Sequence, residues 1–200
     1  MARVVQLAGV SRDSFYEHFE DRGDCLSAAR EEFAALMARR TRAACQRGHG
    51  WVERIRAGLM ALLEGLDENR GLARICVAHA VSFGLPVRGP GSWLLEELVA
   101  ALEEGRESAP ADHQPPAGAA MSAVGGTLGM IHVRLFGSDE PLVDLVNPLM
   151  GMVVLPYLGE AAALRELTRP QGEGQGPTAG AWQAGDGGRS TAGTHERPRR

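Results

Sequence analysis

The chain of 200 residues has no lysine, and all 21 of its basic residues are arginine. Chemistry that needs a lysine side chain, such as a Schiff base, a Walker-type phosphate loop or a lysine general base, is therefore excluded. Aromatic residues are scarce at 5%, whereas 44% of residues are hydrophobic and 23% are charged. This composition predicts a soluble chain with enough apolar material for one or two compact domains.

Cysteine is also scarce. Cys25, Cys45 and Cys76 are odd in number and too widely spaced for a CxxC redox pair or a metal knuckle, which suits a reducing compartment. The longest uncharged apolar run near the C-terminus, Leu149 to Leu158, is far shorter than the roughly 20 residues that span a bilayer. The first residues contain no signal-peptide pattern. We therefore expect a cytoplasmic protein without a membrane span.

Catalytic and metal-binding patterns are missing from the sequence. The six histidines form no HExxH or similar pair. The segment Gly125 to Gly129 has the spacing of a nucleophile elbow with Thr127, but it lies in an apolar helical pattern without a preceding strand. We expect neither an enzyme nor a bound cofactor or metal.

Helical periodicity runs through most of the chain. From the N-terminus to Thr168, apolar residues recur at steps of three and four, and no segment alternates with period two. This pattern predicts an all-α fold, with a long helix from the N-cap Asp21 to near Gly48 and another from Ser92. The predicted core stripes are Leu26, Ala29, Phe33, Leu36 and Met37; Val52, Ile55, Leu59, Leu62, Leu63 and Leu66; Leu72, Ile75, Cys76, His79 and Phe83; and Leu94, Leu95, Leu98, Val99 and Leu102.

Two further helices, about 119–136 and 141–158, are apolar over most of their circumference, so each must bury more than one face. Small residues allow helices to approach closely, and the twofold dimer is the commonest oligomer. We therefore expect the two helices to form a four-helix bundle with a second copy. Burial of the pair within one larger domain is the alternative. The predicted dimer-interface residues are Val124, Gly125, Leu128, Gly129, Leu149 and Val153.

The composition changes abruptly after Thr168. Residues 169–200 are rich in glycine and proline, and Trp182 is their only large apolar residue. Such a segment cannot form a core, so we expect a disordered tail.

The most informative segment is residues 4–22. Gly9 stands at a tight turn, where a positive φ is tolerated, and Ser11 is placed as the N-cap of the next helix. Val10, Phe15 and Phe19 fall on its buried side. This pattern is typical of a helix-turn-helix, and a short helix with an exposed first turn fits the DNA major groove. The side chains expected on its exposed side are Arg12, Asp13, Tyr16 and His18.

These residues resemble the tetracycline-repressor-type (TetR) family of transcriptional regulators. The resemblance is carried by Ala8-Gly9-Val10-Ser11, by Phe15-Tyr16 with His18-Phe19, and by Arg22 with Asp24 and Leu26. Further along, Gly125-Gly126 and Leu155-Pro156-Tyr157-Leu158-Gly159 are similar to the dimerising helices of the family. The resemblance covers residues 1–167.

The resemblance implies a ligand-responsive repressor that binds a palindromic DNA operator as a homodimer. Residues 1–45 would form the DNA-binding unit with its connecting helix, and residues 46–168 the effector-binding and dimerisation domain. Arg12 and Asp13 match positions that face bases, Ser14 lies near the backbone, and Tyr16, His18 and Arg22 match phosphate contacts. The implied DNA-binding residues are Ser11, Arg12, Asp13, Ser14, Tyr16, His18 and Arg22.

A pocket for a small-molecule effector is also expected. Its candidate lining residues are Met60, Cys76, His79, Phe83, Trp93 and His132. The two histidines have the alternative role of hydrogen-bonded core residues.

Two departures from the family pattern keep a second function open. The family's DNA-binding domain has three helices, and we expect the first to be missing, because nothing before Val4 could form it. Residues 1–22 carry three arginines against four acidic residues, a formal charge of −1, although phosphate binding needs positive charge. The alternative is a truncated family member that dimerises or binds a small molecule but has lost DNA binding.

Overall fold

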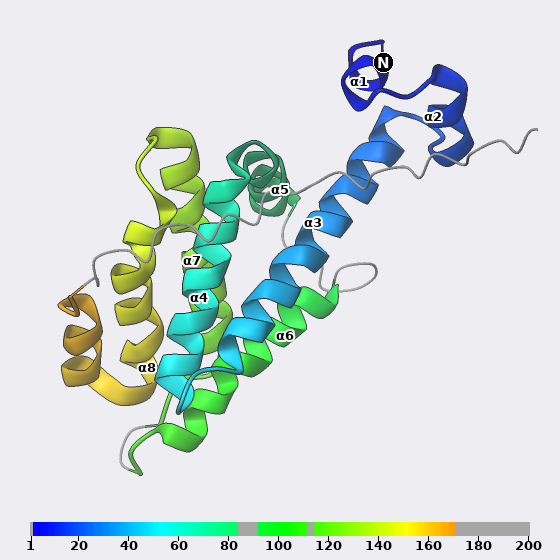
Figure 1. Cartoon of the computed structure of the whole chain (residues 1–200). Coiled ribbons are helices and arrows are strands. Elements are labelled where there is room, and N and C mark those ends of the chain that lie inside the picture. Colours follow the sequence, from blue (N-terminus) through cyan, green and yellow to red (C-terminus); the bar gives the residue numbers. More distant parts are fainter. Residues whose placement is uncertain (1, 84–91, 112–113, 171–200) are drawn as a thin grey trace, which may run out of the picture. The chain divides into compact units, whose positions relative to one another are not determined.

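The computed structural model describes residues 2–83, 92–111 and 114–170, in which every regular element is a helix. The predicted all-α fold is confirmed (Figure 1). Residues 2–169 belong to one compact unit. The predicted disordered tail lies almost wholly outside the described residues. The α-helices are α1 (Ala2–Ala8), α2 (Arg12–His18), α3 (Arg22–Cys45), α4 (Trp51–Glu68), α5 (Arg70–Phe83), α6 (Ser92–Glu103), α7 (Ala119–Gly137) and α8 (Val146–Leu167), and the 3-10 helices are η1 (Glu104–Ser108) and η2 (Leu142–Leu145).

The core lies among α3 to α8, and α1 and α2 lie at the N-terminal end of α3 (Figure 1). The predicted stripe of α3 is correct where that helix packs against α4 and α5, since Phe33 and Met37 are buried. Leu26, nearer its N-terminus, is 38% exposed, and its predicted burial is wrong. The first part of α3 extends past α4 toward α1 and α2 (Figure 1), in keeping with the exposure of Leu26.

The predicted core face of α5 is also corrected. Ile75 is 43% and Phe83 79% exposed, whereas Ala73 and Val77 are buried. The physical reason lies at the end of α7, where the Nε of Arg74 donates to the backbone oxygen of Leu135 at 2.9 Å. The last carbonyls of a helix lack partners within it. With Arg74 bonded to the end of α7, Ala73 and Val77 are buried and Leu72 and Cys76 pack at the edge of the core, whereas Ile75, His79 and Phe83 are exposed.

A kink divides α8. Gly159 has φ of 77°, a conformation that glycine adopts without strain, and residues 160–167 fold back beside the first part of the helix. The two parts lie so close that a Cβ atom added to Gly151 would approach Leu167 to 2.6 Å. A buried ion pair holds the returning segment, since the guanidinium of Arg56 donates to Glu166 from Nε at 2.9 Å and to Asn147 at 2.9 Å.

Two helical stretches, Ala119–Gly137 and Leu142–Leu167, are long and apolar enough to cross a membrane by length and composition alone. Their most apolar windows are 33% and 56% buried within the structure, and core helices of soluble proteins pass the same criterion. The kink at Gly159 interrupts the second stretch, which is therefore not one straight helix from Leu142 to Leu167.

Candidate functional site

The turn between α1 and α2 has a defined geometry. Gly9 has φ of 66°, and its N–H donates to the carbonyl of Gln6 at 3.3 Å. The N–H of Val10 donates to the carbonyl of Val5 at 3.1 Å. These two bonds form a Schellman motif, which ends α1 and satisfies carbonyls that lack helical partners. The predicted tight turn at Gly9 is therefore present, and Gly9 adopts the positive φ that the sequence indicated.

The start of α2 also agrees with the sequence. The Oγ of Ser11 accepts a hydrogen bond from the backbone N–H of Ser14 at 3.0 Å, as an N-cap does. Phe15 is buried, with ring centroids 5.2 Å from Phe19 and 5.5 Å from Tyr16. Val10, expected on the same buried side, is 45% exposed, and that prediction is wrong. The hydrogen bond from the N–H of Val10 to Val5 places Val10 in the turn that ends α1, before α2 begins.

All seven residues predicted to bind DNA are exposed: Ser11, Arg12, Asp13, Ser14, Tyr16, His18 and Arg22. Five of them lie on α2 and one begins α3. Ser11 also has the structural role of the N-cap, which engages its hydroxyl. The structure therefore brings the predicted residues together on one short segment with their side chains accessible.

The charges of this segment are distributed unevenly. Asp21 and Asp24 are engaged at the start of α3, where Asp21 accepts from the N–H of Asp24 at 2.9 Å and Asp24 accepts from the N–H of Glu20 at 3.0 Å. Both carboxylates thus lie at a helix N-terminus, whose partial positive charge offsets negative charge. Among the described residues, Arg12 and Arg22 form no salt bridge.

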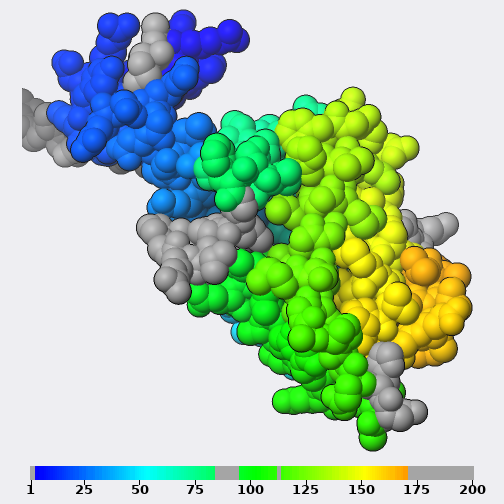
Figure 2. All heavy atoms as spheres, turned by 180° about the vertical axis from the view of Figure 1, so that it is seen from behind, coloured from blue at the N-terminus to red at the C-terminus, as the bar shows by residue number. Residues whose placement is uncertain are grey.

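A second candidate surface lies on α7. Figure 2 shows α7 and α8 side by side on one face of the bundle. The outward stripe of α7 carries no charge from Ala119 to Val133, and open space surrounds Gly125 and Gly129. Beside this stripe, a shallow hollow of about 410 Å³ is lined by Gly126, Gly129, Met130, Val133, Arg134 and Leu145. The exposed large apolar residues of the two helices are Met121, Val133, Phe136, Leu155, Leu164 and Leu167.

The predicted dimer interface is partly corrected by this arrangement. Leu149 is fully buried, and Val124 and Val153 are 8% and 3% exposed, so all three are covered by the chain's own core. Gly125 and Gly129 are exposed and Leu128 is half-buried. The reason for the error is that both helices are apolar on several sides, which leaves the periodicity unable to separate an inner face from an outer one.

The residues predicted to line an effector pocket are dispersed. Cys76, His79 and Phe83 all lie on α5, where His79 and Phe83 are exposed and their rings are 4.9 Å apart. His132 lies on α7 against Phe136, with ring centroids 4.7 Å apart. The side chain of Trp93 lies outside the described residues. The two described cavities include only Met60 of the six, so the effector pocket stays a prediction.

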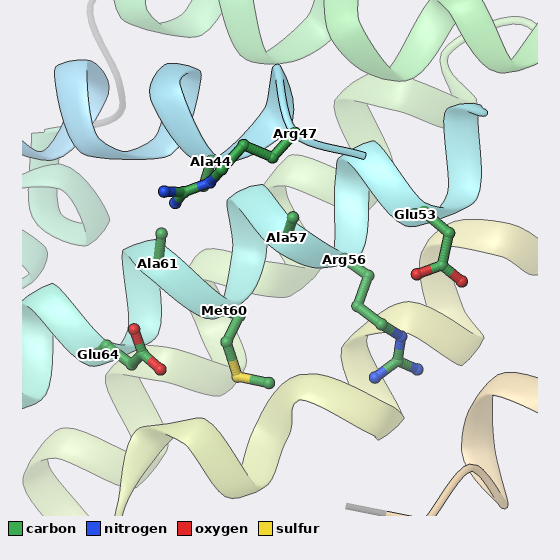
Figure 3. Close-up of a pocket in the computed structure, with 8 residues that line it drawn as sticks. All are labelled: Ala44, Arg47, Glu53, Arg56, Ala57, Met60, Ala61 and Glu64. Atoms are coloured by element: carbon green, nitrogen blue, oxygen red, sulfur yellow. The ribbon is translucent and has the colours of Figure 1, made fainter. Parts of the chain in front are cut away.

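Met60 lines a groove of about 280 Å³ between the end of α3 and α4 (Figure 3). Three alanines form its apolar part, and its charged groups are Arg47, Glu53, Arg56 and Glu64. A hydrogen bond from Arg169, 2.7 Å from Glu53, lowers the pKa of the Glu53 carboxyl. Arg56 is committed to Glu166 and Asn147. Two of the four charges are thus neutralised by partners within the chain.

The sequence does not predict the cluster formed by Arg56, Asn147 and Glu166. Arg56 lies next to Ile55 in a predicted core stripe, and its partners Asn147 and Glu166 are 91 and 110 residues away. The only available signal was an arginine on α4 close to apolar positions, without any indication of which acid would pair with it.

Comparison with protein-family models, curated proteins and solved structures finds no match to this chain.

Proposed function

We propose that this protein is a DNA-binding transcriptional regulator that acts as a homodimer, with α2 as the helix that enters the major groove. The observation that carries the proposal is the pair α1–α2, in which a Schellman turn at Gly9 and the Ser11 N-cap present the exposed residues of α2 at the end of α3. A short, capped helix at the end of a long one is a geometry suited to groove binding.

Each exposed residue of this pair has chemistry that DNA can use. The guanidinium of Arg12 can donate two hydrogen bonds to guanine O6 and N7. The hydroxyl of Tyr16, the imidazole of His18 and the guanidinium of Arg22 can donate to phosphates, which sets the position of α2 on the duplex. Burial of Phe15 beneath Tyr16 and Phe19 holds these side chains on one rigid support.

The second copy would pack on the outward stripe of α7, around Gly125, Gly129 and Val133. A twofold dimer uses the same patch on both chains, and glycines without neighbours allow two helices to approach closely. Two copies of α2 would then read two half-sites of a palindromic operator. Action as a repressor that responds to a small-molecule effector, and location in the cytoplasm, belong to the same proposal.

The second candidate is a protein that dimerises or binds a small molecule without binding DNA. The observation that favours it is the exposed carboxylate of Asp13 in the first turn of α2, where it would face bases or phosphates. Like charges at such an interface cost several kcal/mol in affinity, by the general rule for charged contacts. A neutral or donor group opposite Asp13, such as a cytosine amino group, would remove that cost.

The test is a fluorescence-anisotropy titration with duplexes that the protein itself selects from a random library. We expect Arg22→Ala to weaken binding and to reduce the slope of log K against log[salt] by about 0.9 per lost phosphate contact. Tyr16→Phe should weaken binding through loss of one hydroxyl. The matched control is Arg165→Ala, at an exposed arginine of α8. Selection of no duplex would support the second candidate, and unchanged affinity in Arg22→Ala and Tyr16→Phe would refute these phosphate contacts.

A further inference from the structure

Among the described residues, a polar contact links α3, which follows α1 and α2, to α5, beside the buried packing of Phe33 and Met37 and the Arg40–Glu68 ion pair with α4. The Nη1 of Arg30 on α3 lies 3.3 Å from the Nδ1 of His79 on α5. A second nitrogen of the same guanidinium, Nη2, donates to the Oγ of Ser27 at 3.1 Å, which fixes the direction of the Arg30 side chain. The contact therefore links an oriented arginine on α3 to a histidine on the neighbouring helix.

This contact depends on the protonation state of the imidazole. Arginine has only donors, so Nδ1 of His79 can take part only as an acceptor, with its lone pair free. Protonation of Nδ1 removes the acceptor and places a second positive charge beside the guanidinium. Histidine is the side chain that changes charge between about pH 5 and 8, which makes this reversal accessible under physiological conditions.

The described contacts of His79 include no acidic group that would compensate for that second charge. From α3 it meets Arg30, whose guanidinium also donates to Ser27, and on α5 its ring centroid lies 4.9 Å from that of Phe83. Within the described part of the chain, neither Arg30 nor His79 forms a salt bridge. The buried side of α5, with Ala73 and Val77, points the other way into the core.

We propose that the Arg30–His79 contact is a proton-sensitive joint, closed when His79 is neutral and opened when His79 is protonated, which sets how firmly the first part of α3 is held against α5. Since α3 carries α1 and α2, opening of the joint would loosen their position and lower DNA affinity as the pH falls. That last consequence rests on the proposed function, whereas the joint itself does not.

Cys76 provides a probe of the joint that is independent of DNA. It is half-buried on α5, and the charge of Arg30 acts on its thiol, so the two groups are close. The rate at which a maleimide labels Cys76 at constant pH, read by peptide mass spectrometry of the full chain, reports how often α3 and α5 separate there.

Two variants fix the two charge states. His79→Gln offers a neutral acceptor, and His79→Lys offers a permanent cation. At one fixed pH, we expect Cys76 in His79→Lys to be labelled about fivefold faster than in His79→Gln. That factor corresponds to two unit charges about 4 Å apart screened as in water. The matched control is Ala80→Lys, which keeps His79 and brings a lysine four positions from Cys76 on α5, because a nearby cation alone makes a thiol more reactive. Equal labelling rates in the two His79 variants would overturn the proposal. Labelling of Cys76 in Ala80→Lys as fast as in His79→Lys would also overturn the proposal.

A second measurement covers the case in which His79→Lys fails to fold. In the wild type, the ratio of Cys76 to Cys25 labelling should rise as the pH falls from about 8 to 5.5, the range in which imidazole titrates. Because a maleimide reacts with the thiolate, division by the Cys25 rate removes the dependence on pH that the two thiols share. Arg30→Gln should abolish the rise, and a rise that persists in Arg30→Gln would refute the joint. If no duplex is bound at any pH while labelling still behaves as expected, the proposed function fails and the joint stands.

Discussion

The assignment of inner and outer faces to α7 and α8 can be tested with two single substitutions, Leu149→Ala and Val133→Asp. Leu149 is fully buried in the chain, whereas Val133 is 70% exposed on the outward stripe of α7. We expect Leu149→Ala to unfold more easily without a specific effect on dimerisation. We expect Val133→Asp to keep the stability of the single chain and to dissociate the dimer.

The magnitudes follow from burial and symmetry. A leucine truncated to alanine in a filled core costs about 2–5 kcal/mol of unfolding free energy, because transfer energy is lost and a cavity remains. An exposed substitution such as Val133→Asp changes the stability of the single chain by about 0.5 kcal/mol or less. In a twofold dimer, however, each substitution occurs twice. Carboxylates brought together in an apolar contact cost several kcal/mol, which raises the dissociation constant by about 100-fold or more.

The assay combines sedimentation velocity over a concentration series with urea unfolding at one fixed protein concentration, because dimerisation itself adds apparent stability. Val81→Asp, which places the same charge on an exposed position of α5, is the control for charge alone. The reasoning is refuted if Val133→Asp leaves the dissociation constant unchanged. It is equally refuted if Leu149→Ala dissociates the dimer at unchanged unfolding free energy.

Three further predictions concern stability. Phe15→Ala should cost up to about 3–5 kcal/mol locally, so hydrogen exchange should show lost protection in α2 while α4 to α8 stay protected. Arg56→Met should lower the unfolding free energy by about 3–5 kcal/mol, since it leaves the buried carboxylate of Glu166 with only a 3.9 Å ion pair to Arg169, and adding Glu166→Leu should recover most of the loss in urea titrations. Arginine hydrogen bonds lower the folded-state pKa of Glu53 and Glu68, so their stabilisation is present above the unfolded-state pKa and is lost as the pH falls through the folded-state pKa. We therefore expect a loss of up to about 1 kcal/mol per pair in acid, and a smaller acid effect in the double variant Glu53→Gln, Glu68→Gln.

Features that depend on neighbouring residues were predictable from the sequence. The turn at Gly9 and the caps at Ser11 and Asp21 are present because each requires a particular residue within four positions of its partner. The exposure of α2 is also a local feature. The helix is short, and Phe15 is its buried residue, so its other sides face solvent. The candidate DNA-binding residues were therefore accessible to sequence reasoning.

Features fixed by distant contacts were not predictable. The rotation of α5 is set by bonds from Arg70 and Arg74 to carbonyls at the end of α7, more than 60 residues away. Periodicity alone places Phe83 and Ile75 in the core, but both side chains are exposed. His79 was expected to line a pocket, but it lies on the surface, in contact with Arg30.

The net charge of −4 gives a misleading view of DNA binding, because most arginines between α3 and the end of the compact unit already have acidic partners. Such pairs contribute little net field at a distance. At the N-terminal end the situation differs, since within the described residues Arg12 and Arg22 form no salt bridge, whereas Asp21, one of the four acids in the formal sum of −1, caps α3. The helix N-terminus partly offsets the charge of Asp21, while Asp13, Glu17 and Glu20 stay exposed. Asp13 lies in the first turn of α2, and its replacement by asparagine should strengthen DNA binding most.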